Sequence, residues 1–203
     1  MTAEPDENLR RELLAMRAED EATRARLAET GELFDGYNRE MEAVHLKNAR
    51  RLEKLIDAHG WLGESKVGAD GAEAAWLIVQ HAISKPDLQR RVLKILQTEA
   101  ARGEVPLWQA AFLEDRILSY EGKPQIYGTQ FDWNARDAMS PNEIFEPEKI
   151  DERRASVGLS VPYSEYIKDH NEAVKKSNES APQNHAERQR EFEEWARKVG
   201  WRS

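Results

Sequence analysis

Apolar positions recur along most of this chain with the spacing of amphipathic helices. Within residues 7–29, Leu9, Leu13 and Met16 stand at i, i+4 and i+7, which is a narrow stripe on one helical face. Residues 38–58 carry a fuller stripe, and a glycine follows where a helix usually ends. We expect further helices over residues 72–82, 84–101, 106–120, 150–154, 161–167 and 187–199.

One segment departs from the helical period. Residues 125–131 alternate polar and apolar side chains around Gly128, which is the period of a strand, and residues 142–146 are the expected partner across a loop. Two short strands need a helical surface to rest on. The predicted fold class is therefore mainly α: a single helical domain with a small β-hairpin and helical N- and C-terminal extensions.

Two segments interrupt the helical pattern. Residues 61–71 hold three glycines and are predicted to form a loop, and residues 171–186 have few large apolar groups, which is typical of a linker. We divide the chain into an N-terminal amphipathic helix (1–35), a core domain (36–167), and a polar linker with a C-terminal helix (168–203). The first helix either lies solvated on the domain or joins two copies, so a homo-oligomer is one expectation.

Composition narrows the function classes. The 203 residues include 38 acidic and 30 basic side chains, a formal net charge of −8, whereas broad nucleic-acid binding needs a basic patch. The chain has no cysteine, which removes disulfides and thiolate chemistry. The longest apolar run, residues 74–79, is far shorter than the roughly 20 residues of a membrane span, and no signal peptide is visible. We expect a cytoplasmic protein without nucleic-acid or membrane partners.

Polar residues that interrupt apolar sequence are the candidates for chemistry. Gln80 and His81 end an apolar helix, so His81 is either a satisfied, half-buried histidine or a general acid/base. Asp115 and Arg116 lie inside another helix and point about 100° apart. Either one forms a buried salt bridge while the other faces solvent, or one enters a pocket shared with His81.

A second set of polar residues is suited to orienting a polar ligand rather than to attacking it as a nucleophile. Gln125, Tyr127, Thr129 and Gln130 offer amides, a phenol and a hydroxyl that can hold a carboxylate, amide or phosphate. Asn48 and Arg51 stand at i, i+3 on one helical face, as surface residues or as ligand contacts. The five histidines have no metal-motif spacing, so we assign no metal ligand and no cofactor.

Four segments together resemble a bacterial family of unknown function. They carry the pattern AWLIVQHA…EDR…GKPQIYGTQ…DERRASVGL over residues 71–82, 112–116, 121–130 and 151–159. The resemblance spans about residues 40–167 and implies membership but no reaction. Ile83 and His45 stand where the family pattern leads us to expect an acid, so no carboxylate role is carried over to those positions.

The preferred function is an enzyme that acts on a small polar metabolite without a metal, by hydrolysis, transfer or cyclisation. In this hypothesis His81 is the acid/base, Asp115 orients it and Arg116 holds an anion. The substrate is positioned by Asn48, Arg51, Gln80, Gln125, Tyr127, Thr129 and Gln130. We expect His81, one of Asp115 and Arg116, and residues 125–130 to converge in one pocket. The alternative is a non-catalytic ligand-binding or protein-interaction module.

Overall fold

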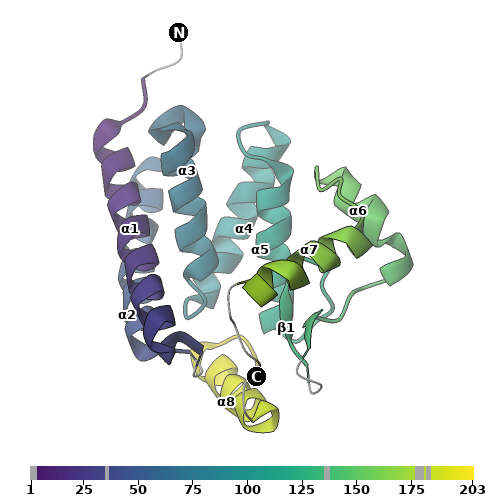
Figure 1. The fold of residues 1–203 in the computed structure, drawn as a ribbon. Helices are drawn as coiled ribbons and strands as arrows, with labels where there is room; N and C mark the ends of the chain where they lie inside the picture. Colours follow the sequence, from purple (N-terminus) through teal and green to yellow (C-terminus); the bar gives the residue numbers. More distant parts are fainter. Residues whose placement is uncertain (1–3, 35–36, 135–137, 177–180, 182–183) are drawn as a thin grey trace. The chain divides into compact units, whose positions relative to one another are not determined.

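The computed structural model describes residues 4–34, 37–134, 138–176, 181 and 184–203. Within them it has eight α-helices and one two-stranded antiparallel sheet, which confirms the mainly α fold class (Figure 1). The chain divides into two compact units, residues 1–109 and 110–203, which we call the first and second unit. Among the described helices, none is long and apolar enough to cross a membrane.

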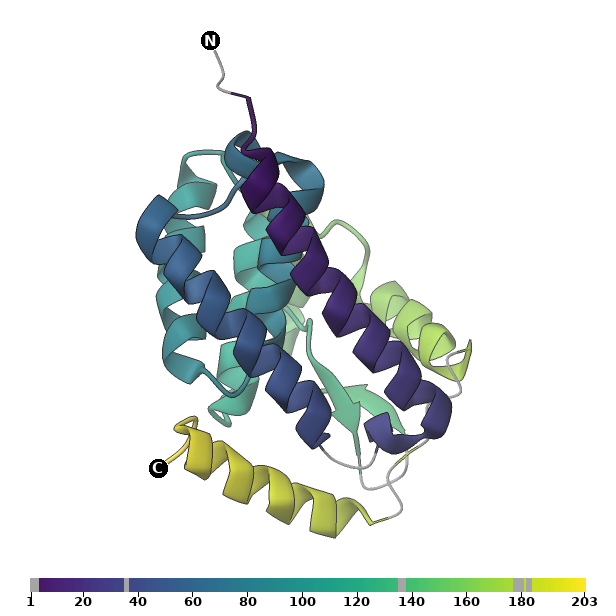
Figure 2. The ribbon, with the colours of Figure 1, turned by 90° about the vertical axis from the view of Figure 1, so that its left-hand side faces the viewer.

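The first unit is a helical assembly. Helix α2 returns alongside α1, and both pack against α3 (Figure 2). Asp6 begins α1 by accepting the backbone N–H groups of Asn8 and Leu9, the usual role of an N-cap aspartate. The elements of this unit are α1 (Glu7–Thr30), a 3-10 turn (Glu32–Phe34), α2 (Arg39–His59), α3 (Glu64–His81) and α4 (Pro86–Ala101).

Helix α1 is more deeply embedded than its narrow stripe suggests. Leu13 and Leu27 are fully buried, and Met16 is nearly so. Burial of a leucine side chain contributes roughly 1.5–3 kcal/mol, so this helix is part of the core of the first unit. Self-association through α1 stays a prediction.

The predicted loop over residues 61–71 is only partly right. Helix α3 begins at Glu64 and is broken by non-helical backbone at Gly68. The apolar residues of the segment, Trp61, Leu62 and Val67, are buried, and their packing draws the chain into the core despite its glycines. At the other end of α3, the buried Gln89 of α4 donates its amide to the carbonyls of Val79 (2.7 Å) and Gln80 (3.2 Å). This side chain adds hydrogen bonds to the carbonyls at the C-terminal end of α3.

The second unit contains a short hairpin, which contacts α7. Strands β1 and β2 pair Phe131 with Pro141 and Trp133 with Met139. The ring of Tyr120 on α5 packs against the rings of Phe192 and Trp201 from the C-terminal segment, with centroids 5.8 and 5.3 Å apart. The elements are α5 (Leu107–Tyr120, from Ala110 onward in this unit), β1 (Phe131–Trp133), β2 (Met139–Pro141), a 3-10 turn (Pro147–Lys149), α6 (Ile150–Ser156), α7 (Tyr163–Lys176) and α8 (His185–Val199).

Two expectations about this unit are corrected. Residues 125–130 form a loop with a single bridge, Gln125 to Ile144, and the hairpin begins only at Phe131. The backbone N–H groups that would enter a strand ladder are donated to the Asp115 carboxylate instead. Residues 171–176, predicted as linker, continue α7; the rest of that segment lies mainly outside the described residues.

Candidate functional site

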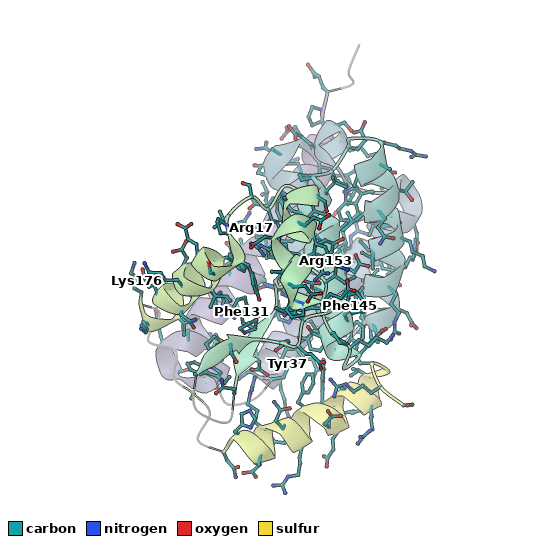
Figure 3. All side chains as sticks on the ribbon, turned by 90° about the vertical axis from the view of Figure 1, so that its right-hand side faces the viewer. Arg17, Tyr37, Phe131, Phe145, Arg153 and Lys176 are labelled. Atoms are coloured by element: carbon teal, nitrogen blue, oxygen red, sulfur yellow. The ribbon has the colours of Figure 1, made fainter. Side chains whose placement is uncertain are left out.

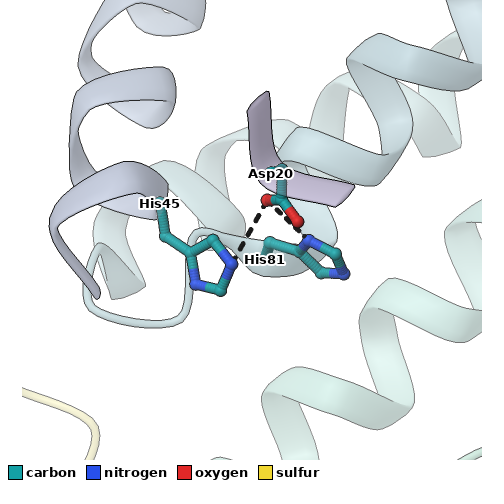
Figure 4. Close-up of side chains that lie close together, drawn as sticks. All are labelled: Asp20, His45 and His81. Atoms are coloured by element: carbon teal, nitrogen blue, oxygen red, sulfur yellow. Dashed lines mark hydrogen bonds and ion pairs between the residues drawn. The ribbon is translucent and has the colours of Figure 1, made fainter. Parts of the chain in front are cut away.

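Three titratable side chains from three helices meet inside the first unit (Figure 4). Asp20 comes from α1, His45 from α2, and His81 is the last residue of α3. His81 Nδ1 lies 2.9 Å and His45 Nε2 lies 3.2 Å from the same oxygen, Asp20 Oδ2. The two imidazole centroids are 5.0 Å apart. We call Asp20, His45 and His81 the histidine–aspartate cluster.

The cluster is graded in exposure. The side chains of Asp20, His45 and His81 are 3%, 10% and 27% exposed, so His81 is the member that solvent reaches most readily. Burial by itself raises the pKa of Asp20, but the imidazoles of His81 and His45 outweigh it and hold the pKa well below its usual range. Asp20 is therefore an anion at neutral pH.

The hydrogen bonding of the cluster is incomplete. Asp20 Oδ1 is buried and has no hydrogen-bond partner in the structure. His45 Nε2 is also buried without a hydrogen bond, because its approach to Asp20 has the distance of an ion pair but not the direction of a hydrogen bond. The other ring nitrogen of His45, Nδ1, lies 2.8 Å from the hydroxyl of Tyr37. Such unpaired buried atoms are uncommon in folded proteins.

The same three residues are the ones that can hold a metal ion in the part of the chain that the structure describes. One ligand atom from each, two imidazole nitrogens and a carboxylate oxygen, lies within 4.8 Å of the other two. The arrangement supports two kinds of chemistry: proton transfer by a histidine that a carboxylate orients, and coordination of a cation.

A second polar cluster forms around Asp115 in the second unit. Asp115 is fully buried, and its carboxylate accepts the backbone N–H groups of Ile126 (2.7 Å), Tyr127 (3.0 Å) and Thr129 (3.0 Å), together with the Thr129 hydroxyl (3.0 Å). Burial raises the pKa of Asp115, and these four donors oppose the rise. The expected salt bridge is thus replaced by a loop that wraps its N–H groups around the carboxylate. We call residues 125–130 the wrapped loop.

The wrapped loop is held from its other side by arginines of α6. Arg153 Nε donates to the Ile126 carbonyl (2.8 Å), and the buried Arg154 donates to the Tyr127 carbonyl (3.0 Å). Arg153 also lies beside the exposed ring of Phe145 (Figure 3). Three N–H groups of the loop therefore contact an anion, and two of its carbonyls contact cations.

The amides of the wrapped loop are also used internally. Gln125 is fully buried and donates to the carbonyls of Gln130 (3.0 Å) and Asn142 (2.9 Å), while its Oε1 accepts the backbone N–H of Gln130. Gln130 Nε2 donates to the Thr129 hydroxyl (3.0 Å). These side chains shape the loop, whereas Tyr127 is half-buried and its pKa is raised by burial.

Two predicted site residues have unsatisfied polar atoms. The Gln80 side chain is buried, and neither its amide nitrogen nor its oxygen has a hydrogen-bond partner. Arg116 Nε is buried without a partner, no ion pair of Arg116 occurs within the described ranges, and burial lowers its pKa while Tyr120 opposes the shift.

Asn48 and Arg51 join α2 to α1. The buried Asn48 donates to the Met16 carbonyl (3.1 Å), and the half-exposed Arg51 pairs with Glu12 (2.9 Å). Both contacts tie the two helices together, and contact with a substrate stays a prediction for both residues.

The predicted residues thus fall into separate groups. His81 belongs to the first unit, and Asp115 with the wrapped loop belongs to the second, so the single shared pocket stays a prediction. Asp20 was not predicted as a site residue, and His45 had no predicted role. Both stand on buried stripes: Asp20 follows Leu13 and Met16 by seven and four residues, and His45 lies between Met41 and Leu52. A charged or titratable residue on such a stripe is the signal that marks them.

Comparison with known proteins identifies the family of this chain but no activity. The model of a family of unknown function, DUF6624, matches residues 6–176 and so includes α1 and every residue of both clusters. No curated protein and no solved structure matches the chain.

Proposed function

Since the chain belongs to the DUF6624 family, whose function is unknown, the site must carry the functional argument, and we propose that the protein is an enzyme acting on a small polar metabolite. The histidine–aspartate cluster is the proposed reaction centre. The reaction class is hydrolysis, group transfer or cyclisation of the metabolite.

The observation that supports this proposal is the buried Asp20 carboxylate shared by two imidazoles. Burying an anion is costly unless it is paired, and an apolar side chain would fill the same place on the α1 stripe at no electrostatic cost. Titratable groups gathered at such a cost are characteristic of functional sites. The His81 side chain is 27% exposed, so a substrate in solvent can contact this member of the cluster.

His81 is the residue we assign to substrate contact. It is the most exposed member of the cluster and stands at a helix end, where Gln89 fixes the last carbonyls of α3. The metal-independent acid/base role expected from the sequence stays a prediction. So do the bacterial origin, the cytoplasmic location and the lack of a nucleic-acid partner.

A second candidate function is a non-catalytic ligand-binding or protein-interaction module. The wrapped loop favours this function, because the polar groups of Asp115, Gln125 and Thr129 form hydrogen bonds that hold the loop itself. Polar groups that are satisfied inside the fold have a structural role, as expected of a non-catalytic module. In this case the second unit binds without taking part in a reaction.

The proposal is tested with a panel of polar metabolites: amino acids, organic acids, nucleotides and sugar phosphates. Each is incubated with the full chain, and its consumption is followed by mass spectrometry. We expect at least one compound to be consumed, and we expect His81→Gln to lower its turnover by roughly 10²-fold or more.

The matched control is His59→Gln, the same substitution at an exposed position on α2 of the same unit. It should leave turnover unchanged. A panel in which compounds bind, as shown by thermal shift, but none is consumed contradicts the enzyme proposal and favours the module. Equal turnover in His81→Gln and wild type removes the cluster as reaction centre.

A further inference from the structure

We infer that Asp20, His45 and His81 bind a divalent first-row transition-metal ion. The inference deepens the proposed function, on which its catalytic use rests, but the binding itself is a property of the cluster. The five histidines have no motif spacing along the sequence, and the site appears only when three helices bring positions 20, 45 and 81 together.

The separations between the ligand atoms match a coordination shell. Nitrogen and oxygen ligands at about 2.0–2.2 Å from an ion, at octahedral to tetrahedral angles, lie roughly 2.9–3.5 Å from one another. His81 Nδ1 and His45 Nε2 lie 2.9 and 3.2 Å from Asp20 Oδ2. These two separations are those of neighbouring ligands on a single ion, and one ligand atom from each of the three residues lies within 4.8 Å of the other two.

The donor set selects the class of ion. Imidazole nitrogens favour zinc, iron, cobalt, nickel or copper, whereas magnesium and calcium prefer all-oxygen sites. Two histidines and one carboxylate also leave coordination positions for water or substrate, as in catalytic rather than structural zinc sites. The partial exposure of His81 places that open side within reach of solvent.

The surroundings favour an ion over a purely hydrogen-bonded cluster. Both imidazoles approach the same oxygen, Asp20 Oδ2, and Asp20 Oδ1 and His45 Nε2 are left buried without a hydrogen bond. A bound ion gives the lone pair of His45 Nε2 a partner and places a positive charge beside the Asp20 carboxylate. Tyr37, at 2.8 Å from His45 Nδ1, accepts the proton of that nitrogen when Nε2 binds the ion, which is the usual way a ligating histidine is oriented.

The experiment uses the full chain without a histidine tag, stripped with a chelator and then titrated with Zn²⁺ in a calorimeter. Co²⁺ is a second probe, because its visible absorption reports the coordination. We expect one saturable site per chain and a thermal midpoint that rises with Zn²⁺. His45→Gln, His81→Gln and Asp20→Asn should abolish the site, and Tyr37→Phe should weaken affinity by about 10- to 100-fold.

His59→Gln is again the matched control and should bind Zn²⁺ like the wild type. Circular dichroism checks that each variant is folded, and Tyr37→Phe supplies a graded test if a ligand variant is not. The inference is overturned if the stripped wild type shows no saturable binding, or if His45→Gln and His81→Gln bind as tightly as wild type.

The two proposals fail in different ways. Zinc binding that depends on the three ligands, with no metabolite consumed, supports the metal site and contradicts the enzyme. Turnover that persists in stripped protein in the presence of chelator supports the enzyme, contradicts a metal role and returns His81 to the acid/base role.

Discussion

Replacement of Asp115 by asparagine tests whether this buried carboxylate exists to shape the wrapped loop. Asparagine keeps the size and the planar end of the side chain but replaces one acceptor oxygen by an NH₂ donor. In the native structure both oxygens are occupied: Oδ1 accepts from Ile126 and Tyr127, and Oδ2 accepts from Thr129. The variant therefore changes hydrogen bonding with little change in packing.

The magnitude follows from counting the donors that asparagine cannot serve. If the amide oxygen takes the Oδ1 position, the N–H of Thr129 faces an NH₂ group; if it takes the Oδ2 position, the N–H of Ile126 does. One buried backbone donor is orphaned in either case, at a cost of about 1–3 kcal/mol. We expect Asp115→Asn to lower the free energy of unfolding by that amount.

The assay is urea unfolding at neutral pH followed by far-ultraviolet circular dichroism, with the urea dependence compared between proteins to confirm that the same transition is measured. The control is Asp87→Asn, whose side chain is fully exposed and whose contact with Arg90 is long, at 3.5 Å. It should change stability by less than about 0.5 kcal/mol. If Asp115→Asn is equally silent, the carboxylate does not hold the loop, and an orienting role in catalysis becomes the better explanation.

Three further predictions rest on packing and charge. Gly128→Ala should lower the free energy of unfolding in urea by about 2–5 kcal/mol, because the backbone has a φ of +68° and a Cβ would lie 2.5 Å from the ring of Tyr163. Gly158→Ala is the control: its φ is +84° but the space around it is open, so it should lower that free energy by only about 1–2 kcal/mol. Equal losses would refute the clash. Leu13→Ala should cost about 2–5 kcal/mol by the same assay, and a loss below 1 kcal/mol would mean that α1 is not part of the core. The hydrogen bond from Arg10 lowers the pKa of Asp70 to about 2, so this pair contributes stability above pH 4 that is lost as the pH falls toward 2. Carboxyl NMR should show that pKa rising toward its usual value in Arg10→Gln, and an unchanged value would contradict the pairing.

The helices were the predictable part of this fold, since their apolar stripes specify both element and buried face. Helix α2 shows the limit of such predictions: Met41 and Leu52 on its stripe are buried, but no role was predicted for His45, which lies between them. A polar residue on a buried stripe has a partner on another helix, and the pattern of one helix does not show which. Asp20 became a site residue only when α1 was placed beside α2 and α3.

The wrapped loop shows a different limit. Period-two alternation in residues 125–131 describes side chains, but the backbone N–H groups decide whether a ladder forms. Here Asp115, ten residues before Gln125, takes those N–H groups, and Arg154 takes a carbonyl from the opposite side. The alternation is visible in a single sequence, but the competition between acceptors for the backbone N–H groups is not.

The hydrogen bonds of the wrapped loop to both α5 and α6 have a consequence for folding. The N–H groups of Ile126, Tyr127 and Thr129 find their acceptor on α5, which precedes the loop, but the carbonyls of Ile126 and Tyr127 find their donors on α6, which follows it. During synthesis these two carbonyls therefore have no donor on α6 until residues 153 and 154 have been added to the chain. The closure of this unit awaits a contact across 27 residues, between Tyr127 and Arg154, and such non-local steps are among the slower ones in folding.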